Sequence, residues 1–330
     1  MPILGMGTYT GGRFNQKCQR GEIKEAIKLY FRKGGRMLDC AQNYLNEDEI
    51  GEAVAESIEE GVVTRQDIFI TSKLNNPYHK PEHVQMALEK TLKDLGTGYV
   101  DLYLMHWPTA FVPVPFDENE RGFPQSYEPD QCHKVTGKLW EETHWDKTHS
   151  WPPHLQRGVT VHETWAKMTE MVSKGLCRAV GICNFQVQLL HELSCNTDVM
   201  PAVLQAEAHP FLQQAGLRKH CKHLSIQFQS YSPLGYGMFK KDHEHTVMTH
   251  PSIIKIAEKH SKTPAQVCLR WASQSGIATN PLSLVPEEME QNLASPAFDL
   301  DQSDFDSIAA MDRNFHYLRP QDWYGLPYWD

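Results

Sequence analysis

The sequence lacks an apolar run near the roughly 20 residues that a membrane span needs. Its start, MPILGMGTYTGG, lacks the basic and apolar regions of a secretory signal. It also lacks excess positive charge, because 32 lysines and arginines face 41 aspartates and glutamates, for a net charge of −9. None of the eight cysteines forms a C-x-x-C pair. These absences predict no membrane or nucleic-acid partner, and free thiols in a cytoplasmic protein.

What the sequence does contain is an alternation of short apolar runs and amphipathic helical segments. The apolar runs are mostly non-alternating, as in parallel strands buried on both faces. We expect strands at 3–9, 36–40, 67–73, 100–106, 178–183, 202–208, 225–231 and 278–283. Eight strands separated by helices favour a single α/β domain over residues 1–330, folded as a (β/α)8 TIM barrel.

Helical periodicity supports the segments between these strands. Apolar residues recur at helical spacing from Ile23 to Tyr30, from Val84 to Leu95 and from Val161 to Val172. Further helices are expected at 186–195, 213–222, 251–260, 264–274, 286–293 and 302–311.

One segment, 109–159, breaks the alternation and is rich in proline, aromatic and charged residues. Loops of this length are usually functional or disordered, and its aromatic residues argue against full disorder. It follows strand 4, so we expect it to lie over the C-terminal mouth of the barrel, on the substrate side. Its potential metal ligands lack ordered spacing, so no metal site is predicted. They are Cys132, His133, Glu141, His144, Asp146, His149 and His154.

Polar residues stand at or near the C-terminal ends of seven of the expected strands. In a TIM barrel these strand ends converge on the active site. A structural salt-bridge cluster is the alternative interpretation, because buried ionisable groups need partners. The residues are Asp39, Lys73, His106, Asn184, Gln205, Tyr231 and Ser283.

Three of these residues and a nearby tyrosine predict acid–base chemistry. A lysine ammonium at Lys73 would lower the pKa of the Tyr44 phenol, and Asp39 would balance the lysine charge. Tyr44 could then transfer a proton near neutral pH. His106 adds a donor for a carbonyl oxygen, and Trp107 an apolar wall. Such a set suits protonation of an oxygen whose carbon receives a hydride.

Sequence blocks from residue 2 to the C-terminus resemble the aldo-keto reductases. They are MPILGMGTY, LDCAQNYLNEDEIGEAV, IFITSKL, VDLYLMHWP, GICNF, LQAEAHPFLQQ, YSPLG and PQDWYGLPYWD. The resemblance implies a (β/α)8 barrel that binds extended NADPH and reduces aldehydes and ketones. It also implies a monomer or weak dimer. Its catalytic tetrad matches Asp39, Tyr44, Lys73 and His106.

The resemblance also implies a cofactor site. Asn184 and Gln205 would bind the nicotinamide carboxamide, and Tyr231 would stack on the ring. Ser232 and Leu234 would meet the pyrophosphate. The other cofactor residues implied are Gly7, Thr8, Tyr9, Asp39, Cys183, Ser283, Leu284, Glu288, Gln291 and Asn292, the last at the adenine. The substrate residues implied are Tyr9, Tyr44, Asn75, His106 and Trp107.

The sequence departs from the family pattern at two cofactor positions. The lysine and arginine that usually hold the 2′-phosphate of NADPH are Leu282 and Glu288 here. Two charge-assisted contacts are lost and a carboxylate is gained, so we predict a preference for NADH. The alternative is that Lys240 or Lys241 supplies the missing charge.

Three other departures concern the nicotinamide, the substrate pocket and the start of the chain. Cys183 replaces the usual serine before Asn184 and is a weaker donor to the nicotinamide. Asn75 replaces a frequent tryptophan, which predicts a roomier or more polar pocket. The family hairpin before the first strand has no counterpart before MPILG, which predicts that the barrel bottom lacks its plug or that the chain is truncated.

Two other functions stay open at this point. Leu282, Glu288 and Cys183 are compatible with a non-catalytic member of the family, such as a crystallin or a cofactor-sensing subunit. A barrel isomerase or aldolase could use Lys73 as a Schiff base, although the family blocks argue against it. The identity of the substrate is not predicted.

Overall fold

The computed structural model describes residues 1–10, 20–113, 155–235, 246–320, 326, 328 and 329. Eight parallel strands form one sheet in which each strand pairs with the next along the chain. They are β1 (Met6–Gly7), β2 (Met37–Asp39), β3 (Phe69–Leu74), β4 (Val100–Met105), β5 (Cys177–Cys183), β6 (Val203–Glu207), β7 (Gln227–Tyr231) and β8 (Ala278–Thr279).

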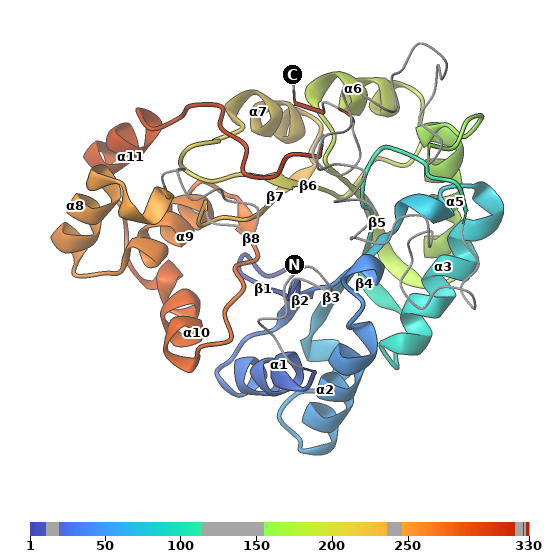
Figure 1. Cartoon of the computed structure of the whole chain (residues 1–330), viewed down its shortest axis with the longest axis horizontal. Coiled ribbons are helices and arrows are strands. Elements are labelled where there is room, and N and C mark those ends of the chain that lie inside the picture. The colour runs from blue at the N-terminus through green and yellow to red at the C-terminus, as the bar shows by residue number, and fades with distance from the viewer. Residues whose placement is uncertain (11–19, 114–154, 236–245, 321–325, 327, 330) are drawn as a thin grey trace, which may run out of the picture.

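The first and last strands meet and close the sheet. Leu4 and Thr279 form a parallel bridge, in which Gly5 N donates to Thr279 O and Thr279 N donates to Ile3 O, both at 2.9 Å. The strands surround the centre of Figure 1 and the helices lie outside them. The prediction of a (β/α)8 barrel is therefore confirmed.

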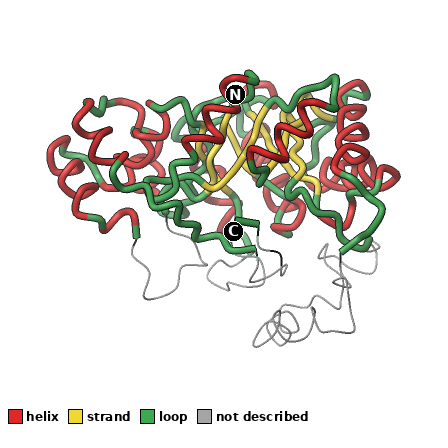
Figure 2. The backbone as a smooth tube through the Cα atoms, turned by 90° about the horizontal axis from the view of Figure 1, so that it is seen from above, coloured by secondary structure: helices red, strands yellow, loops and turns green. Residues whose placement is uncertain are grey.

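Helices cover the outside of the sheet, as Figures 1 and 2 show. They are α1 (Glu22–Arg32), α2 (Glu47–Glu59), α3 (Pro81–Asp94), α5 (Val161–Ser173), α6 (Val187–Cys195), α7 (Ala215–His223), α8 (Pro251–His260), α9 (Pro264–Gln274), α10 (Pro286–Leu293) and α11 (Gln302–Ala309). None of the helices described here is long and apolar enough to cross a membrane.

The local sequence explains where several helices begin. Thr160 and Glu163 form a capping box at the start of α5, and Thr263 and Gln266 form another at α9. Pro264 occupies the first turn of α9, where a missing N–H costs nothing. The expected helices at 251–260, 264–274 and 286–293 have the observed bounds.

The expected first and last strands are longer than the observed ones. Only Met6–Gly7 of 3–9 and Ala278–Thr279 of 278–283 are regular strand. Pro281 has no N–H to donate, so the ladder cannot continue through it. Pro281 O still accepts from Gly7 N at 3.1 Å, which keeps the two segments adjacent beyond the strands.

The strands separate two hydrophobic layers. Successive residues of a strand face opposite sides of the sheet. In β4, Leu102 and Leu104 belong to a small cluster inside the barrel, whereas Tyr103 and Met105 belong to the large core under the helices. His106 continues the inward-facing series, which places it at the inner rim of the barrel.

Several sequence predictions fall outside the described residues. The stretch 114–154 of the expected loop does so, as do Lys240 and Lys241. The two ends of the loop are described. Phe111 and Leu155 form an antiparallel bridge, and Gln156 N donates to Ala110 O at 2.9 Å.

Candidate active site

A buried ion pair lies inside the barrel at the ends of β2 and β3. Lys73 Nζ lies 3.0 Å from Asp39 Oδ1 and donates to Cys40 O at 2.8 Å. The side chain of Lys73 is fully buried and that of Asp39 is 5% exposed. Burying two charges is costly unless they pair closely and have further hydrogen bonds. This pair meets both conditions.

Tyr44 lies against this pair, at the end of the 3-10 helix η2 (Gln42–Tyr44). Its hydroxyl accepts a hydrogen bond from Lys73 Nζ at 3.3 Å. Leu45 adopts a φ of 60°, which turns the chain from η2 towards α2. Asn46 Nδ2 then donates to Thr8 O at 2.8 Å and holds this turn against the β1 side of the barrel.

The pKa of Tyr44 differs from the sequence expectation. Removal of its hydroxyl from water raises the pKa above the usual value, and the positive charge of Lys73 offsets only part of this effect. For Lys73, burial acts to lower the pKa, but Asp39 together with Tyr44 and Cys183 outweighs it and the net shift is upward. At neutral pH the phenol is therefore protonated and the lysine charged.

His106 follows β4 and lies beside the phenol. The centroids of its ring and the Tyr44 ring are 5.9 Å apart in an edge-on arrangement. Burial, followed by the charge of Lys73, lowers the pKa of His106 well below its usual value. The imidazole is thus neutral and has one N–H to donate. Within the described residues its buried Nδ1 has no hydrogen-bond partner.

An amide network extends from Asp39 across the barrel. Gln205 Nε2 donates to Asp39 Oδ1 and to Gln229 Oε1, both at 2.9 Å. Cys183 Sγ donates to Gln205 Oε1 at 3.7 Å. The thiol, a weaker donor than the serine hydroxyl usual in the family, therefore still has a hydrogen-bond partner. Sequence reasoning missed Gln229, although Q-x-Y at the end of an expected strand was a usable signal.

Asn184 connects the His106 side of the mouth to the Tyr231 side. It adopts a φ of 62° just after β5. Its Nδ2 donates to His106 O at 2.8 Å, and its Oδ1 accepts from Tyr231 Oη at 2.7 Å. These bonds fix the Tyr231 ring, which is partly exposed.

The residues beyond β7 are compatible with a dinucleotide. Ser232 adopts a φ of 49° in a tight turn that Gly235 N closes at 3.0 Å. Exposed or partly exposed surface is present both at this turn and in the segment that leads into α10. The residues that contribute it are Tyr231, Ser232, Leu234, Leu282, Leu284 and Glu288.

The α10 end of this surface carries the departures from the family pattern. Leu282 is 38% exposed. It lies close to Gly7, since a Cβ atom added to that glycine would be 3.8 Å from the Leu282 Cβ. Glu288 is exposed and accepts a hydrogen bond from Ser283 Oγ at 2.6 Å. Asn292 is buried, and Gln291 O accepts from Gln266 Nε2 at 3.1 Å.

The other predicted residues near Tyr44 have different surroundings. Thr8 is buried, and its hydroxyl donates to Asp39 O at 2.9 Å. The Tyr9 ring packs against the Tyr44 ring, with centroids 4.9 Å apart. Asn75 is fully buried, and its Oδ1 accepts from Asn76 N at 2.9 Å as the cap of η4 (Asn76–Tyr78). Its carboxamide thus stabilises a turn beside β3.

Trp107 is buried in an aromatic cluster that sequence reasoning did not foresee. The centroid of its ring lies 5.2 Å from that of the Tyr328 ring and 6.2 Å from that of the Trp329 ring. Phe111 and Leu155, at the ends of the long loop, belong to the same cluster. The C-terminal residues Tyr328 and Trp329 are thereby placed next to Trp107, which follows His106 in the chain.

No group of three or more histidine, cysteine or acidic side chains in the described ranges could hold a metal ion. The possible ligands between Cys132 and His154 lie outside those ranges.

Comparisons with known proteins agree with this geometry. Residues 3–313 match the model of the aldo/keto reductase family. The chain is 37% identical over 323 residues to aldo-keto reductase family 1 member A1 of Gallus gallus, covering 97% of this chain and 88% of the relative. It is 36% identical over 333 residues to the NAD(P)H-dependent D-xylose reductase of Candida tenuis, covering 99% and 94%.

A solved structure, the aldose reductase from Schistosoma japonicum, is also similar. It superposes with a TM-score of 0.81 at 29% identity, and the match covers all of this chain and 94% of that one. The whole-length match, the closed barrel and the four residues at its mouth lead to one conclusion: the chain belongs to the aldo/keto reductase family.

Proposed function

We propose that this protein reduces an aldehyde or ketone to the alcohol, with NAD(P)H as reductant and Tyr44 as the acid. The observation that carries the proposal is the placement of one buried lysine, Lys73, within 3.0 Å of Asp39 and 3.3 Å of the Tyr44 hydroxyl. The relatives support it, since one is named an NAD(P)H-dependent D-xylose reductase and another an aldose reductase.

Each residue has a distinct role in this reaction. The bound nicotinamide supplies the hydride that adds to the carbonyl carbon. Tyr44, protonated because burial raises its pKa, donates its proton to the carbonyl oxygen. Lys73 stabilises the phenolate that remains, and Asp39 compensates the lysine charge. The neutral His106 ring donates a hydrogen bond that orients the carbonyl oxygen.

The test of the acid is Tyr44→Phe. We expect kcat to fall by about 10²–10⁴-fold, the usual contribution of a general acid. Quenching of tryptophan fluorescence by the cofactor should persist, since the phenol hydroxyl is not needed to bind it. Tyr103→Phe is the matched control, because this buried tyrosine belongs to the core under the helices. Turnover by Tyr44→Phe equal to that of Tyr103→Phe would rule out the proposed acid.

The first substrates to assay are aldoses and simple aldehydes. The names of the two reductases above point to sugars, and Tyr231 and Asn184 place polar groups near the mouth.

The same geometry supports a preference for NADH. A 2′-phosphate near Leu282 would meet an apolar side chain, and Glu288 would repel it. The Glu288 carboxylate, held by Ser283 at 2.6 Å, is able instead to accept a hydrogen bond from a ribose 2′-hydroxyl. We expect kcat/KM to be higher with NADH than with NADPH.

A double change tests this preference. Leu282→Lys/Glu288→Arg should shift the NADPH-to-NADH ratio of kcat/KM by at least about 100-fold, because two charge-assisted contacts are gained. Glu287→Arg is the control, since it makes the same charge change as Glu288→Arg on the same exposed turn of α10. Higher kcat/KM with NADPH in the unmodified protein would contradict the proposal.

The non-catalytic alternative makes the opposite prediction for the unmodified chain. A scaffold protein would show no fluorescence quenching by either nicotinamide and no turnover of any aldehyde. The close Asp39–Lys73–Tyr44 arrangement argues against it, because a scaffold gains nothing from a costly buried charge beside a partly exposed phenol.

A further inference from the structure

A second buried carboxylate stands at the mouth of the barrel, at the end of β6. Glu207 is fully buried, and both of its oxygens are used. Oε1 accepts from His209 Nε2 at 3.1 Å and from Tyr317 N at 2.9 Å. Oε2 accepts from His316 Nδ1 and from Leu318 N, both at 3.2 Å.

These four donors keep Glu207 ionised. Burial acts to raise the pKa of the carboxyl, but the hydrogen bonds and charge interactions with His209 and His316 together outweigh it and hold the pKa at about 2. Three of the four donors come from residues 316–318, which lie about 110 residues later in the chain. A single carboxylate therefore attaches the C-terminal segment 316–318 to the barrel.

The attached segment in turn fixes Trp329. The His316 ring stacks on the Trp329 indole, with centroids 4.5 Å apart and an interplanar angle of 6°. Leu318 O accepts a hydrogen bond from Trp329 Nε1 at 2.9 Å. Two of the residues that Glu207 holds thus contact the indole, one at its face and one at its edge.

The indole is part of the wall beside the catalytic residues. Its centroid lies 6.2 Å from that of Trp107, the residue after His106. Trp329 and its neighbour Tyr328 are partly exposed, so they present apolar surface next to the mouth. On β6, Glu207 shares a face with Gln205, which donates to Asp39. The strand β6 therefore carries both Glu207 and a residue that contacts Asp39.

We propose that Glu207 is a positioning residue that holds segment 316–318, and through it the Trp329 indole, in place to bind the apolar part of a bulky carbonyl substrate. The proposal rests on the reductase function proposed above. It predicts that Glu207 governs the KM for large aromatic aldehydes and has little influence on small ones or on the chemical step.

The test is Glu207→Gln, which keeps the shape of the side chain but removes its charge and replaces an acceptor oxygen with an amide nitrogen. With 2-naphthaldehyde, KM should rise at least 10-fold and kcat should change less than 3-fold. With propanal, both parameters should stay within 2-fold. Glu207→Asp keeps the charge and should recover part of the 2-naphthaldehyde affinity.

Hydrogen exchange gives a readout that does not need activity. The Tyr317 and Leu318 amides donate directly to Glu207, so their exchange should accelerate at least 10-fold in Glu207→Gln. If the unmodified protein reduces neither aldehyde, the reductase proposal fails, whereas the exchange experiment still decides whether Glu207 anchors the segment.

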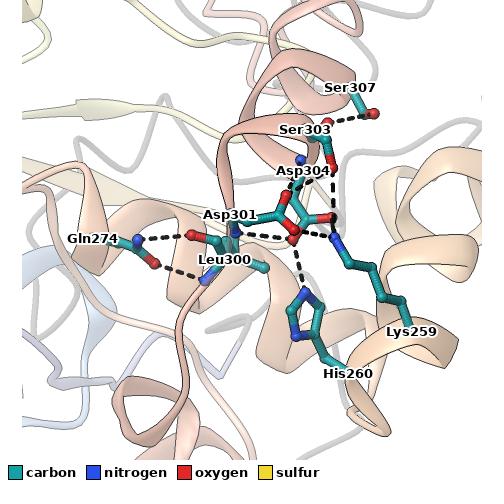
Figure 3. A network of polar contacts seen from close by, with 8 residues as sticks. All are labelled: Lys259, His260, Gln274, Leu300, Asp301, Ser303, Asp304 and Ser307. Carbon is teal, nitrogen blue, oxygen red and sulfur yellow. Dashed lines mark hydrogen bonds and ion pairs between the residues drawn. The ribbon is translucent and has the colours of Figure 1, made fainter.

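Asp304→Asn is the matched control. Asp304 is 2% exposed and accepts from Lys259 at 2.8 Å and His260 at 2.7 Å, in a network that joins α8 to α11 (Figure 3). It is likewise a buried carboxylate with a histidine partner, but it holds no residue of the mouth. Its loss should lower Tm without changing the ratio of the two KM values or the exchange of residues 317 and 318.

His316→Leu keeps the proposal testable if Glu207→Gln does not fold. It removes the ring stacked on Trp329 and leaves the carboxylate three donors. It should raise KM for 2-naphthaldehyde at least 3-fold and leave KM for propanal unchanged. The proposal is overturned if exchange at residues 317 and 318 is unchanged in Glu207→Gln, or if both KM values rise together as in a general loss of structure.

Discussion

Charge is arranged in opposite ways on the outside and the inside of this barrel. Outside, basic residues before and along α1 face acidic residues along and just after α2, and each has a partner 28 positions later. The basic residues are Arg20, Lys24, Lys28 and Arg32, and the acidic residues are Asp48, Glu52, Glu56 and Glu60. Inside, one lysine meets one aspartate away from water.

The solvent makes the difference between the two regions. The outer ladder gains little from each pair, because its carboxylate side chains are 37–55% exposed and water and salt screen the charges. Its members also share partners, since Lys28 contacts both Glu56 and Glu60. The buried pair has no such redundancy, so loss of Asp39 would leave Lys73 charged and uncompensated. Loss of one charge of the inner pair should therefore destabilise the protein strongly, whereas loss of one charge of the outer ladder should have little effect.

The largest effect is expected when the inner pair is broken. Asp39→Asn should reduce the free energy of unfolding by about 3–5 kcal/mol, as measured by chemical denaturation. Asp39→Leu/Lys73→Met removes both charges and should recover a large part of this loss. If the double variant were less stable than Asp39→Asn, the ion pair would contribute to the stability of the barrel beyond the neutralisation of its own two charges.

A smaller effect, dependent on pH, is expected at Glu47. This buried carboxyl at the start of α2 has two hydroxyl partners, Ser72 at 2.5 Å and Thr91 at 3.0 Å. Burial raises its pKa from 4.5 to about 7. The folded state therefore holds a proton that the unfolded state releases between pH 4.5 and 7. Stability from this group is present below that window and is lost as pH rises through it.

Glu47→Gln removes that titration. The stability of the variant relative to the unmodified protein should increase from pH 5 to pH 8, by up to about 3 kcal/mol. Unfolding at both pH values measures the difference. A relative stability that is constant with pH would mean that Glu47 is ionised throughout, despite its burial.

The smallest effect is expected in the outer ladder. Glu56→Gln breaks contacts to Lys24 and Lys28, yet Tm should stay within about 2 °C of the unmodified protein. Even this difference should disappear in 1 M salt, where the screening length is about 3 Å. A larger loss of Tm, or one that resists salt, would place the ladder in the same class as the inner pair.

The sequence predicts the barrel and its inner residues for a local reason. Asp39, Lys73 and His106 each stand at the end of a short apolar run, and parallel strands bring such ends together. The ladder was also readable, because basic residues recur every four positions from residue 20 and acidic ones from residue 48. Its spacing was overlooked.

Other features depend on contacts that no local pattern contains. Glu207 was only part of a family block, since its partners at 316–318 are far away in sequence. The pKa of the Tyr44 phenol likewise could not be predicted from the sequence alone. The sequence supplies the cation that lowers the pKa, but only the fold shows how much water is removed from the hydroxyl. Asn75 was expected at the pocket, and the cap it forms depends on the turn beside it.

The bridge between Leu4 and Thr279 has a consequence for synthesis of the chain. The ring cannot be completed until the ribosome has released the last strand, so β1 keeps an unpaired edge while most of the protein is made. The barrel interior that encloses Lys73 and Asp39 is therefore complete only when β8 pairs with the segment before β1.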